Sequence, residues 1–212
     1  ASPGHRFYIQ GSYTKQYLGF GATSVAVFWE ARTINNTSYI FASDANGDGA
    51  NGDLIYIPRD KSEMNFVDGV TSGITYTAAQ QADAFEAYIQ QDKYLREHRG
   101  QYAERGGVFL PMVKRMDLSL TQDVFKNIKG KRNAGQFRID ITNFGNLLNH
   151  DWGVGTRLVN PQILTSPSAD ANGALTYNLQ TLNGTLLTNP YQTSASLGDV
   201  YGLMLSFRYT FN

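Results

Sequence analysis

Apolar and polar side chains alternate strictly over residues 200–212, at the end of the chain. Because successive residues of a strand point to opposite sides, this pattern predicts a β-strand with one apolar and one polar face. The apolar face would hold Tyr201, Leu203, Leu205, Phe207, Tyr209 and Phe211. An antiparallel strand of a soluble sandwich also alternates, but a face this rich in large apolar residues is typical of a strand whose outer side meets lipid.

Four more segments alternate in the same way: residues 6–13, 22–33, the stretch that begins at Pro111, and 134–143. The chain is therefore predicted to be all-β, with five long antiparallel strands. Charged residues recur on the polar faces of these strands: Glu30, Arg32, Arg115, Asp117, Arg138, Asp140 and Arg208. Pairing of opposite charges across adjacent strands is available on this face. Such a face is typical of a water-filled lumen, because unpaired charges in a dry core would cost several kcal/mol.

The connections between the predicted strands alternate in length. Those near residues 14–21 and 127–133 are short, whereas those that contain residues 35–109 and 151–195 are long. Bacterial outer-membrane barrels show this rhythm, with short turns in the periplasm and long loops outside the cell. We therefore expect transmembrane strands, extracellular long loops and a periplasmic C-terminus.

Five strands are too few to close a barrel, because about eight are needed. An open strand edge in lipid would leave backbone groups unpaired. Residues 1–212 are thus predicted to be the C-terminal portion of one large barrel domain, or to contribute strands to a barrel shared between chains. The start of the chain, ASPGHRFYIQ, has no basic or apolar leader segment, so we expect a processed chain or a piece of a longer one.

The long loops contain local structure of their own. Residues 77–100 form a helix candidate, with Thr77 as N-cap and Gly100 as C-cap. The polar face of this helix carries mixed charges, so we expect it to pack on its own loop. The sequence DANG at residues 170–173 predicts the turn of a hairpin.

Composition narrows the class of protein further. Charged residues make up only 17% of the chain and aromatic residues 13%, with 13 Tyr and 12 Phe, which suits aromatic girdles at two water–lipid interfaces. The net charge is zero and no basic run stands out, so nucleic acid is not an expected partner. The absence of cysteine excludes disulfides, thiolate metal sites and cysteine nucleophiles. No apolar stretch is long enough for a membrane-spanning helix.

One acidic segment, DANGDG at residues 44–49, matches the first half of a calcium-binding loop. Ile55 occupies the position where a closing glutamate belongs, and Asp53 lies two places earlier. The candidate calcium ligands are Asp44, Asn46, Asp48 and Asp53, and Asp60 is another residue that would close the site. Alternatively, these side chains only stabilise turns in an acidic surface loop.

Catalytic patterns are not found in the sequence. His5, His98 and His150 are scattered and have no neighbouring metal-ligand motif. Neither a nucleophile elbow nor a phosphate-binding loop occurs, and structural pairing in a lumen explains the Arg and Asp residues of the strands. We predict no enzymatic activity.

Four runs, taken in order, resemble the C-terminal barrel region of TonB-dependent outer-membrane receptors: residues 44–60, 85–107, 110–124 and 136–154. The closest resemblance is to the Oar-like group, whose full-length members carry an N-terminal carboxypeptidase-regulatory-like domain. The terminal FRYTF is similar to an outer-membrane assembly signal, in which Phe207, Tyr209 and Phe211 would be read, although Asn212 follows them.

The resemblance implies a barrel of about 22 strands around a plug, energised from the inner membrane through a TonB box. This chain would then supply the last barrel wall and the extracellular loops of a transporter. The implied partners are the lipid bilayer, the N-terminal barrel and plug of the same protein, the TonB system, the barrel-insertion machinery and other proteins of an outer-membrane complex.

Two alternatives stay open. The barrel would serve only as an anchor if the protein is an adhesin or assembly component that binds partners through a calcium-stiffened loop. A soluble β-rich enzyme is a third reading of the alternation.

Overall fold

The computed structural model describes residues 4–19, 21–127, 133–194 and 196–211. Contacts divide the chain into two compact units. The sheet unit contains the described residues of Gly4–Ile34, Pro111–Thr156 and Thr193–Asn212, and the loop unit contains Asn35–Leu110 and Arg157–Gln192. Both parts of the loop unit are insertions between strands of the sheet unit.

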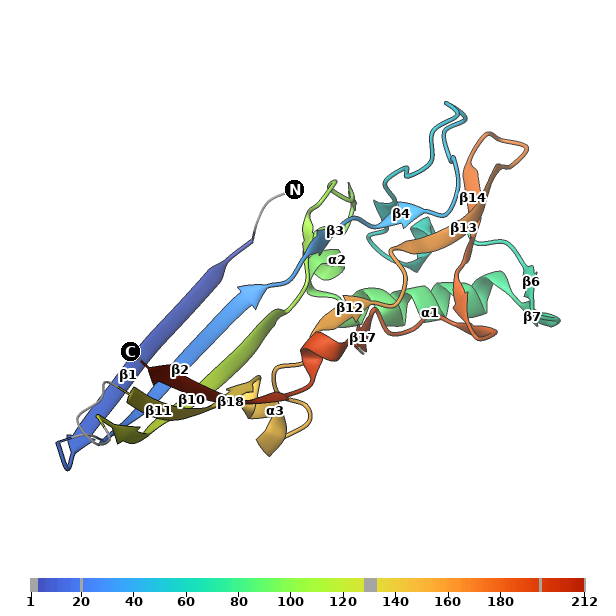
Figure 1. The fold of residues 1–212 in the computed structure, drawn as a ribbon. Coiled ribbons are helices and arrows are strands. Elements are labelled where there is room, and N and C mark those ends of the chain that lie inside the picture. The colour runs from blue at the N-terminus through green and yellow to red at the C-terminus, as the bar shows by residue number, and fades with distance from the viewer. Residues whose placement is uncertain (1–3, 20, 128–132, 195, 212) are drawn as a thin grey trace. The chain divides into compact units, whose positions relative to one another are not determined.

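The sheet unit contains five long antiparallel strands in a single sheet (Figure 1). They are β1 (Arg6–Tyr17), β2 (Gly21–Thr33), β10 (Met112–Lys126), β11 (Asn133–Thr142) and β18 (Gly202–Phe211). Their spatial order follows their order in the chain. The all-β prediction and the five strands are therefore confirmed. β1 extends to Tyr17, so the first connection is shorter than predicted, and the predicted turn at residues 127–133 lies mostly outside the described residues.

The register of the strands separates the two faces of the sheet. Arg115 lies opposite Glu30, and Ser119 lies opposite Asp140, and paired residues of antiparallel strands point to the same side. The predicted polar residues therefore share one face, called the polar face: Glu30, Arg32, Arg115, Asp117, Arg138, Asp140 and Arg208. The other, called the apolar face, includes Ile9, Val27, Trp29, Met116, Leu118, Ile139, Leu205 and Phe207.

Aromatic rings gather at one end of the apolar face. The register of β10 and β11 shifts between Asp123 and Phe125, which places Phe125 opposite Gly135. A side chain at Gly135 would collide with the Phe125 ring. The ring of Tyr209 lies 6.1 Å from that of Phe125 and stacks at 5.7 Å on Phe211. Because residue 135 is glycine, the Phe125 ring of β10 can lie over β11.

The loop unit is built from short elements. Its helices are η1 (Lys61–Glu63), α1 (Ala78–Gln91) and α2 (Lys93–Glu97). Its strands are β3 (Asn36–Thr37), β4 (Ile40–Phe41), β5 (Tyr56–Ile57), β6 (Gly69–Thr71), β7 (Ile74–Tyr76), β8 (Gln101–Tyr102), β9 (Val108–Phe109), β13 (Gln162–Ala169), β14 (Leu175–Leu179), β15 (Thr181–Leu182) and β16 (Thr185–Leu186). The strands β12 (Thr156–Leu158) and β17 (Tyr191–Thr193) pair with each other. The helices α3 (Phe144–Leu148) and η3 (Leu197–Asp199) belong to the sheet unit. No helix in the described part of the chain is long and apolar enough to cross a membrane.

The helix predicted at residues 77–100 is two helices. Thr77 caps α1 as predicted, in a capping box with Gln80. Asp92 then adopts an extended conformation, and its carboxylate accepts a hydrogen bond of 2.9 Å from the Leu95 N–H, so a second helix begins there. The prediction of one continuous helix is wrong because Asp92 is a better cap than a helix residue.

Both insertions contribute to one hydrophobic core. Phe85, Tyr88 and Ile89 of α1 are completely buried, and Ile163 and Leu164 of β13 pack in the same cluster. β13 pairs with β4 from the first insertion and with β14 from the second. The hairpin predicted at residues 170–173 joins β13 to β14 and is confirmed. The two long loops therefore fold as one unit.

A buried carboxylate fastens the two insertions together. Asp92 is completely buried and accepts hydrogen bonds from the hydroxyl groups of Tyr39, at 2.6 Å, and Tyr191, at 2.7 Å. Burial raises the pKa of both tyrosines, so both remain donors at neutral pH. Since Tyr39 and Tyr191 come from different insertions, Asp92 ties them to α2.

Candidate functional site

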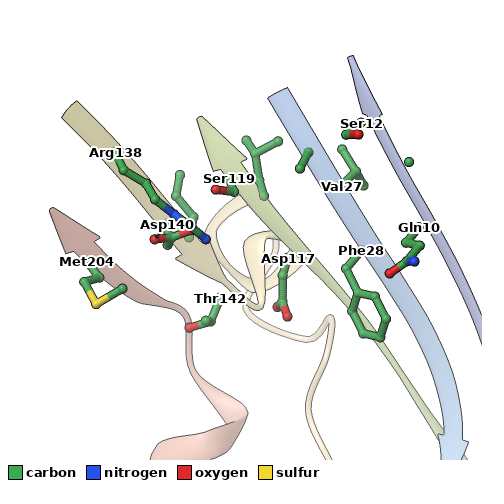
Figure 2. A pocket seen from close by; sticks show the side chains of 14 residues that line it. Gln10, Ser12, Val27, Phe28, Asp117, Ser119, Arg138, Asp140, Thr142 and Met204 are labelled. Carbon is green, nitrogen blue, oxygen red and sulfur yellow. Dashed lines mark hydrogen bonds and ion pairs between the residues drawn. The ribbon is translucent and has the colours of Figure 1, made fainter. Parts of the chain in front are cut away.

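A hollow of about 680 Å³ lies on the polar face of the sheet (Figure 2). All five long strands contribute to it, so the pairing of the sheet holds its shape. The polar and bulky side chains that line it are Gln10, Ser12, Phe28, Asp117, Ser119, Arg138, Asp140, Thr142 and Met204. Three of the seven predicted polar-face residues, Asp117, Arg138 and Asp140, meet in this hollow.

Arg138 and Asp140 form a close ion pair inside the hollow. The Arg138 Nε lies 2.8 Å and 2.9 Å from the two carboxylate oxygens of Asp140, and Nη2 lies 2.8 Å from Oδ1. Both residues belong to β11, so the structural pairing of Arg138 with Asp140 runs along one strand rather than across to β10. Residues two apart in a strand point to the same side, which brings Arg138 to its own neighbour. Asp117 on β10 instead accepts a hydrogen bond of 2.8 Å from the Asn143 N–H.

Glu30 is the centre of a second charged group on the polar face. Its side chain lies 2.7 Å from Arg6 Nη2 on β1 and 3.2 Å from Arg32 Nε on its own strand. Glu30 is only 8% exposed, so it needs these cations to compensate for the loss of water. The two arginines are the more exposed partners, at 62% and 45% of their side chains. They remain available to another charged or polar surface.

Arg115 belongs to a buried cluster at the end of the polar face. Its Nη2 lies 2.6 Å from Asp199 Oδ1, and its Nε donates to the Gly153 carbonyl at 3.0 Å. Asn143, in the left-handed conformation with φ of 50°, donates from Nδ2 to the Asp199 carbonyl at 3.0 Å. Two connecting segments, the one after β11 and the one before β18, are thus fixed to one strand end.

Asp199 remains ionised in this cluster. Burial alone would raise its pKa, but hydrogen bonds from Ser196, Ser194 and the Gly155 N–H lower the pKa of Asp199 to about 2. Sequence analysis did not find Asp199, which lies just outside an alternating segment, or Asn143, which is the last residue of one. Only the closeness in space of Arg115 and Asp199 identifies them as partners.

The predicted calcium ligands come together in one turn-rich loop. Asp44 accepts hydrogen bonds from the Gly47 and Gly49 N–H groups at 2.7 and 2.8 Å, and these bonds, led by that of Gly49, lower its pKa. Asp53 accepts from the Ala45 N–H at 2.7 Å. Asn46 donates its side-chain amide to both Asp48 and Asp53, each at 3.2 Å.

These hydrogen bonds are of the kind that stabilises turns, which is the alternative interpretation of the segment. Asp60 caps η1 by accepting from the Ser62 N–H at 2.8 Å. Within the described ranges, no group of three or more histidine and acidic residues is placed to hold a metal. Calcium binding stays a prediction.

The predicted assembly signal lies on the apolar face. Phe207, Tyr209 and Phe211 occur at alternate positions of β18 and are 54%, 51% and 75% exposed. The Phe207 ring lies 4.9 Å from that of Phe137 on β11. The three rings thus form an exposed aromatic strip along the end of the strand.

Comparison of the chain with protein-family models, with curated proteins and with solved structures found no match. The function is therefore argued from the geometry of the two units and from the resemblance described above.

The buried cluster predicts a pH dependence of stability. Because the folded pKa of Asp199 lies below its ordinary value of 3.8, the stability that it contributes is complete above about pH 4 and is lost as the pH falls towards 2. At pH 7, Asp199→Asn should lower the melting temperature of the complete protein by several degrees, and the difference from wild type should vanish near pH 2. Asp151→Asn, at an exposed carboxylate, is the control. A pH-independent difference for Asp199→Asn would contradict this account.

Proposed function

We propose that this chain forms the last wall and the extracellular domain of a TonB-dependent outer-membrane receptor. One observation carries the proposal: the apolar face of a single-layered sheet is exposed. Ile9, Leu205 and Phe211 are 69%, 70% and 75% exposed. Exposed apolar surfaces of this extent mark contact with a membrane or a partner, and strict alternation with a charged face is typical of transmembrane barrels.

The height of the apolar face supports a membrane as its surroundings. In the described strands, the charged residues of this face are Lys15 and Lys114, near its two ends. Lys15 pairs with Thr23 and Lys114 with Ala31. The two lysine rows therefore enclose seven uncharged positions of β2, 24–30, and span nine positions when both rows are counted. A tilted transmembrane strand needs about 9–11 residues, so one crossing would place the two lysines at its ends.

The polar face supports a lumen. It carries both charges, and its arginines Arg6, Arg32 and Arg138 are exposed beside the carboxylates that they neutralise. A plug domain would dock against this face and the hollow in it. The outer edges of β1 and β18 are free among the described strands, so further strands must pair there to close a barrel in lipid. The resemblance to TonB-dependent receptors supplies the identity of this barrel.

The loop unit is the proposed ligand-binding and gating domain. Both of its insertions leave the sheet at the end where β2 and β11 finish and β10 and β18 begin. Under the proposal this end is extracellular, and the aromatic end of β18 is periplasmic. Because the two insertions share one core, they move as one body rather than as two independent loops. Ligand binding to either insertion would therefore act on both connections to the wall.

A second candidate is an adhesin or assembly component anchored by the barrel. It is favoured by the compact core of the loop unit, which a partner protein would recognise as a folded surface. In that case the loop at residues 44–53 would be stiffened by calcium. Partner binding that requires calcium but not the proton-motive force would favour this candidate over the transporter.

Two adjacent residues of β18 test the membrane wall. Leu203 is on the apolar face, in the row of Val27 midway between the two lysine rows, and Met204 is on the polar face, opposite Asp140. In the complete protein, Leu203→Arg should destabilise the inserted barrel by about 2–4 kcal/mol, as arginine does at a lipid-facing midplane position. Met204→Arg, the control, should be tolerated because Asp140 is near. Urea unfolding in lipid vesicles measures both, and equal effects would contradict the assignment of the faces.

The role of the loop unit is tested by Asp92→Ala. This change leaves the buried hydroxyl group of Tyr39 and the half-buried hydroxyl group of Tyr191 without this acceptor, at a cost of about 1–3 kcal/mol for the buried group. Hydrogen exchange of amides in Asn35–Leu110 should become faster, while the protein still inserts. Energised uptake should fall strongly if the loop unit gates or binds ligand. Unchanged uptake, despite faster exchange, would rule out that role.

The aromatic strip is tested by replacing Phe207, Tyr209 and Phe211 with serine in the complete protein. We expect loss of the protein from the outer membrane, because these rings are the proposed assembly signal and part of the periplasmic girdle. Arg208→Ser with Thr210→Ser, on the opposite face of the same strand, is the matched control. Normal outer-membrane levels of the serine variant would disprove an assembly role.

A further inference from the structure

A second pocket opens on the apolar face, at the end where β10 begins. Its volume is about 550 Å³, and its walls come from the start of β10, from β2 and from the loop after α3. The residues that line it include Trp29, Met112, Lys114, Met116, Asp151 and Trp152. The chain contains only two tryptophans, and both line this pocket.

The side chains suit a molecule that is partly apolar and partly charged. An indole ring has an apolar body and one polar N–H, and tryptophan is enriched where lipid meets water. The flexible thioethers of Met112 and Met116 adapt to irregular apolar shapes. A chain of methylene groups would find apolar contacts on both sides of the pocket.

Lys114 supplies a positive charge at the boundary of the apolar face. Its side chain is exposed and forms no ion pair among the described residues. The neighbouring Arg115 also lines the pocket, but its guanidinium is held by Asp199 at 2.6 Å. The Asp151 carboxylate lies 3.2 Å from His150 Nε2. Lys114 is therefore the cation available to a ligand.

The surroundings of the pocket continue its apolar surface. Leu147 and Leu148 of α3 are 46% and 64% exposed, and Trp152 is 56% exposed. Leu147 and Leu148 follow the end of β11 and precede the pocket-lining residues Asp151 and Trp152 in the sequence. Under the proposed function, these exposed apolar side chains add to the apolar residues of β2 and β10 that line the pocket.

We infer that this pocket binds one phosphate-bearing anionic lipid of the outer leaflet, for which phosphatidylglycerol serves as the anionic probe. The phosphate pairs with the Lys114 ammonium, and the first part of an acyl chain lies between Trp29, Met116 and Trp152. The occupant follows from charge complementarity at Lys114 and from the continuity of the pocket with the apolar face. The inference rests on the proposed membrane function, because that function places the pocket at the edge of the bilayer.

The complete protein, purified in detergent, provides the test. It is titrated with phosphatidylglycerol or with phosphatidylcholine of the same acyl chains, and bound lipid is counted by native mass spectrometry. Wild type should retain phosphatidylglycerol in preference to phosphatidylcholine. Lys114→Gln should bind phosphatidylglycerol about five-fold more weakly, the contribution of one lysine near a membrane surface. Trp152→Ala should weaken both lipids, because acyl contacts are lost.

Lys15→Gln is the matched control, since Lys15 is the lysine at the other end of the same face. It should bind phosphatidylglycerol as wild type does. Equal losses for the two lysine variants, no preference of wild type for the anionic lipid, or displacement of the lipid by inorganic phosphate would each overturn the inference. Release of the wild-type protein from membranes by urea would instead disprove the proposed membrane function, so the two failures are distinguishable.

Discussion

The pairing register of the five long strands is the constraint on which the structure depends. In a single-layered antiparallel sheet, a slip of one residue would move every side chain of a strand to the opposite face. The observed register places Glu30 beside Arg115 and Trp29 beside Met116, so charge and apolar surface stay separate from β1 to β18. The hollow on the polar face and the uncharged band on the apolar face are both consequences of this register.

The apolar side chains of the two units have different surroundings. In the loop unit, large residues such as Tyr39, Phe85 and Ile163 are completely buried in a shared core. In the sheet unit, residues of the same kind, such as Ile9 and Leu205, are exposed. Apolar burial in water stabilises the first unit. Under the proposed function, the second obtains the corresponding stabilisation from contact with lipid.

The sequence predicts those features that are encoded locally. Alternation over ten or more residues defines each strand and both of its faces, and DANG at residues 170–173 defines a hairpin. The break in the helix at Asp92 could not be predicted, because it depends on Tyr39 and Tyr191 from two separate insertions. For the same reason, the choice of partner by Arg115 among several carboxylates is settled only by the fold. At residues 44–53 the candidate calcium-binding oxygens can be identified from the sequence. Whether backbone N–H groups already donate hydrogen bonds to them can be seen only in the fold.

The start of β10 links the buried cluster on the polar face to the pocket on the apolar face. Lys114 and Arg115 are adjacent and therefore point to opposite faces of the sheet. Arg115 is fixed by Asp199 and by the Gly153 carbonyl, and Gly153 and Trp152 are neighbours in the same loop. The buried cluster on the polar face thus holds the strand that carries Lys114 and the loop that carries Trp152. Both walls of the apolar pocket are therefore held by contacts on the opposite side of the sheet. These contacts position Lys114 and Trp152 although both side chains are exposed.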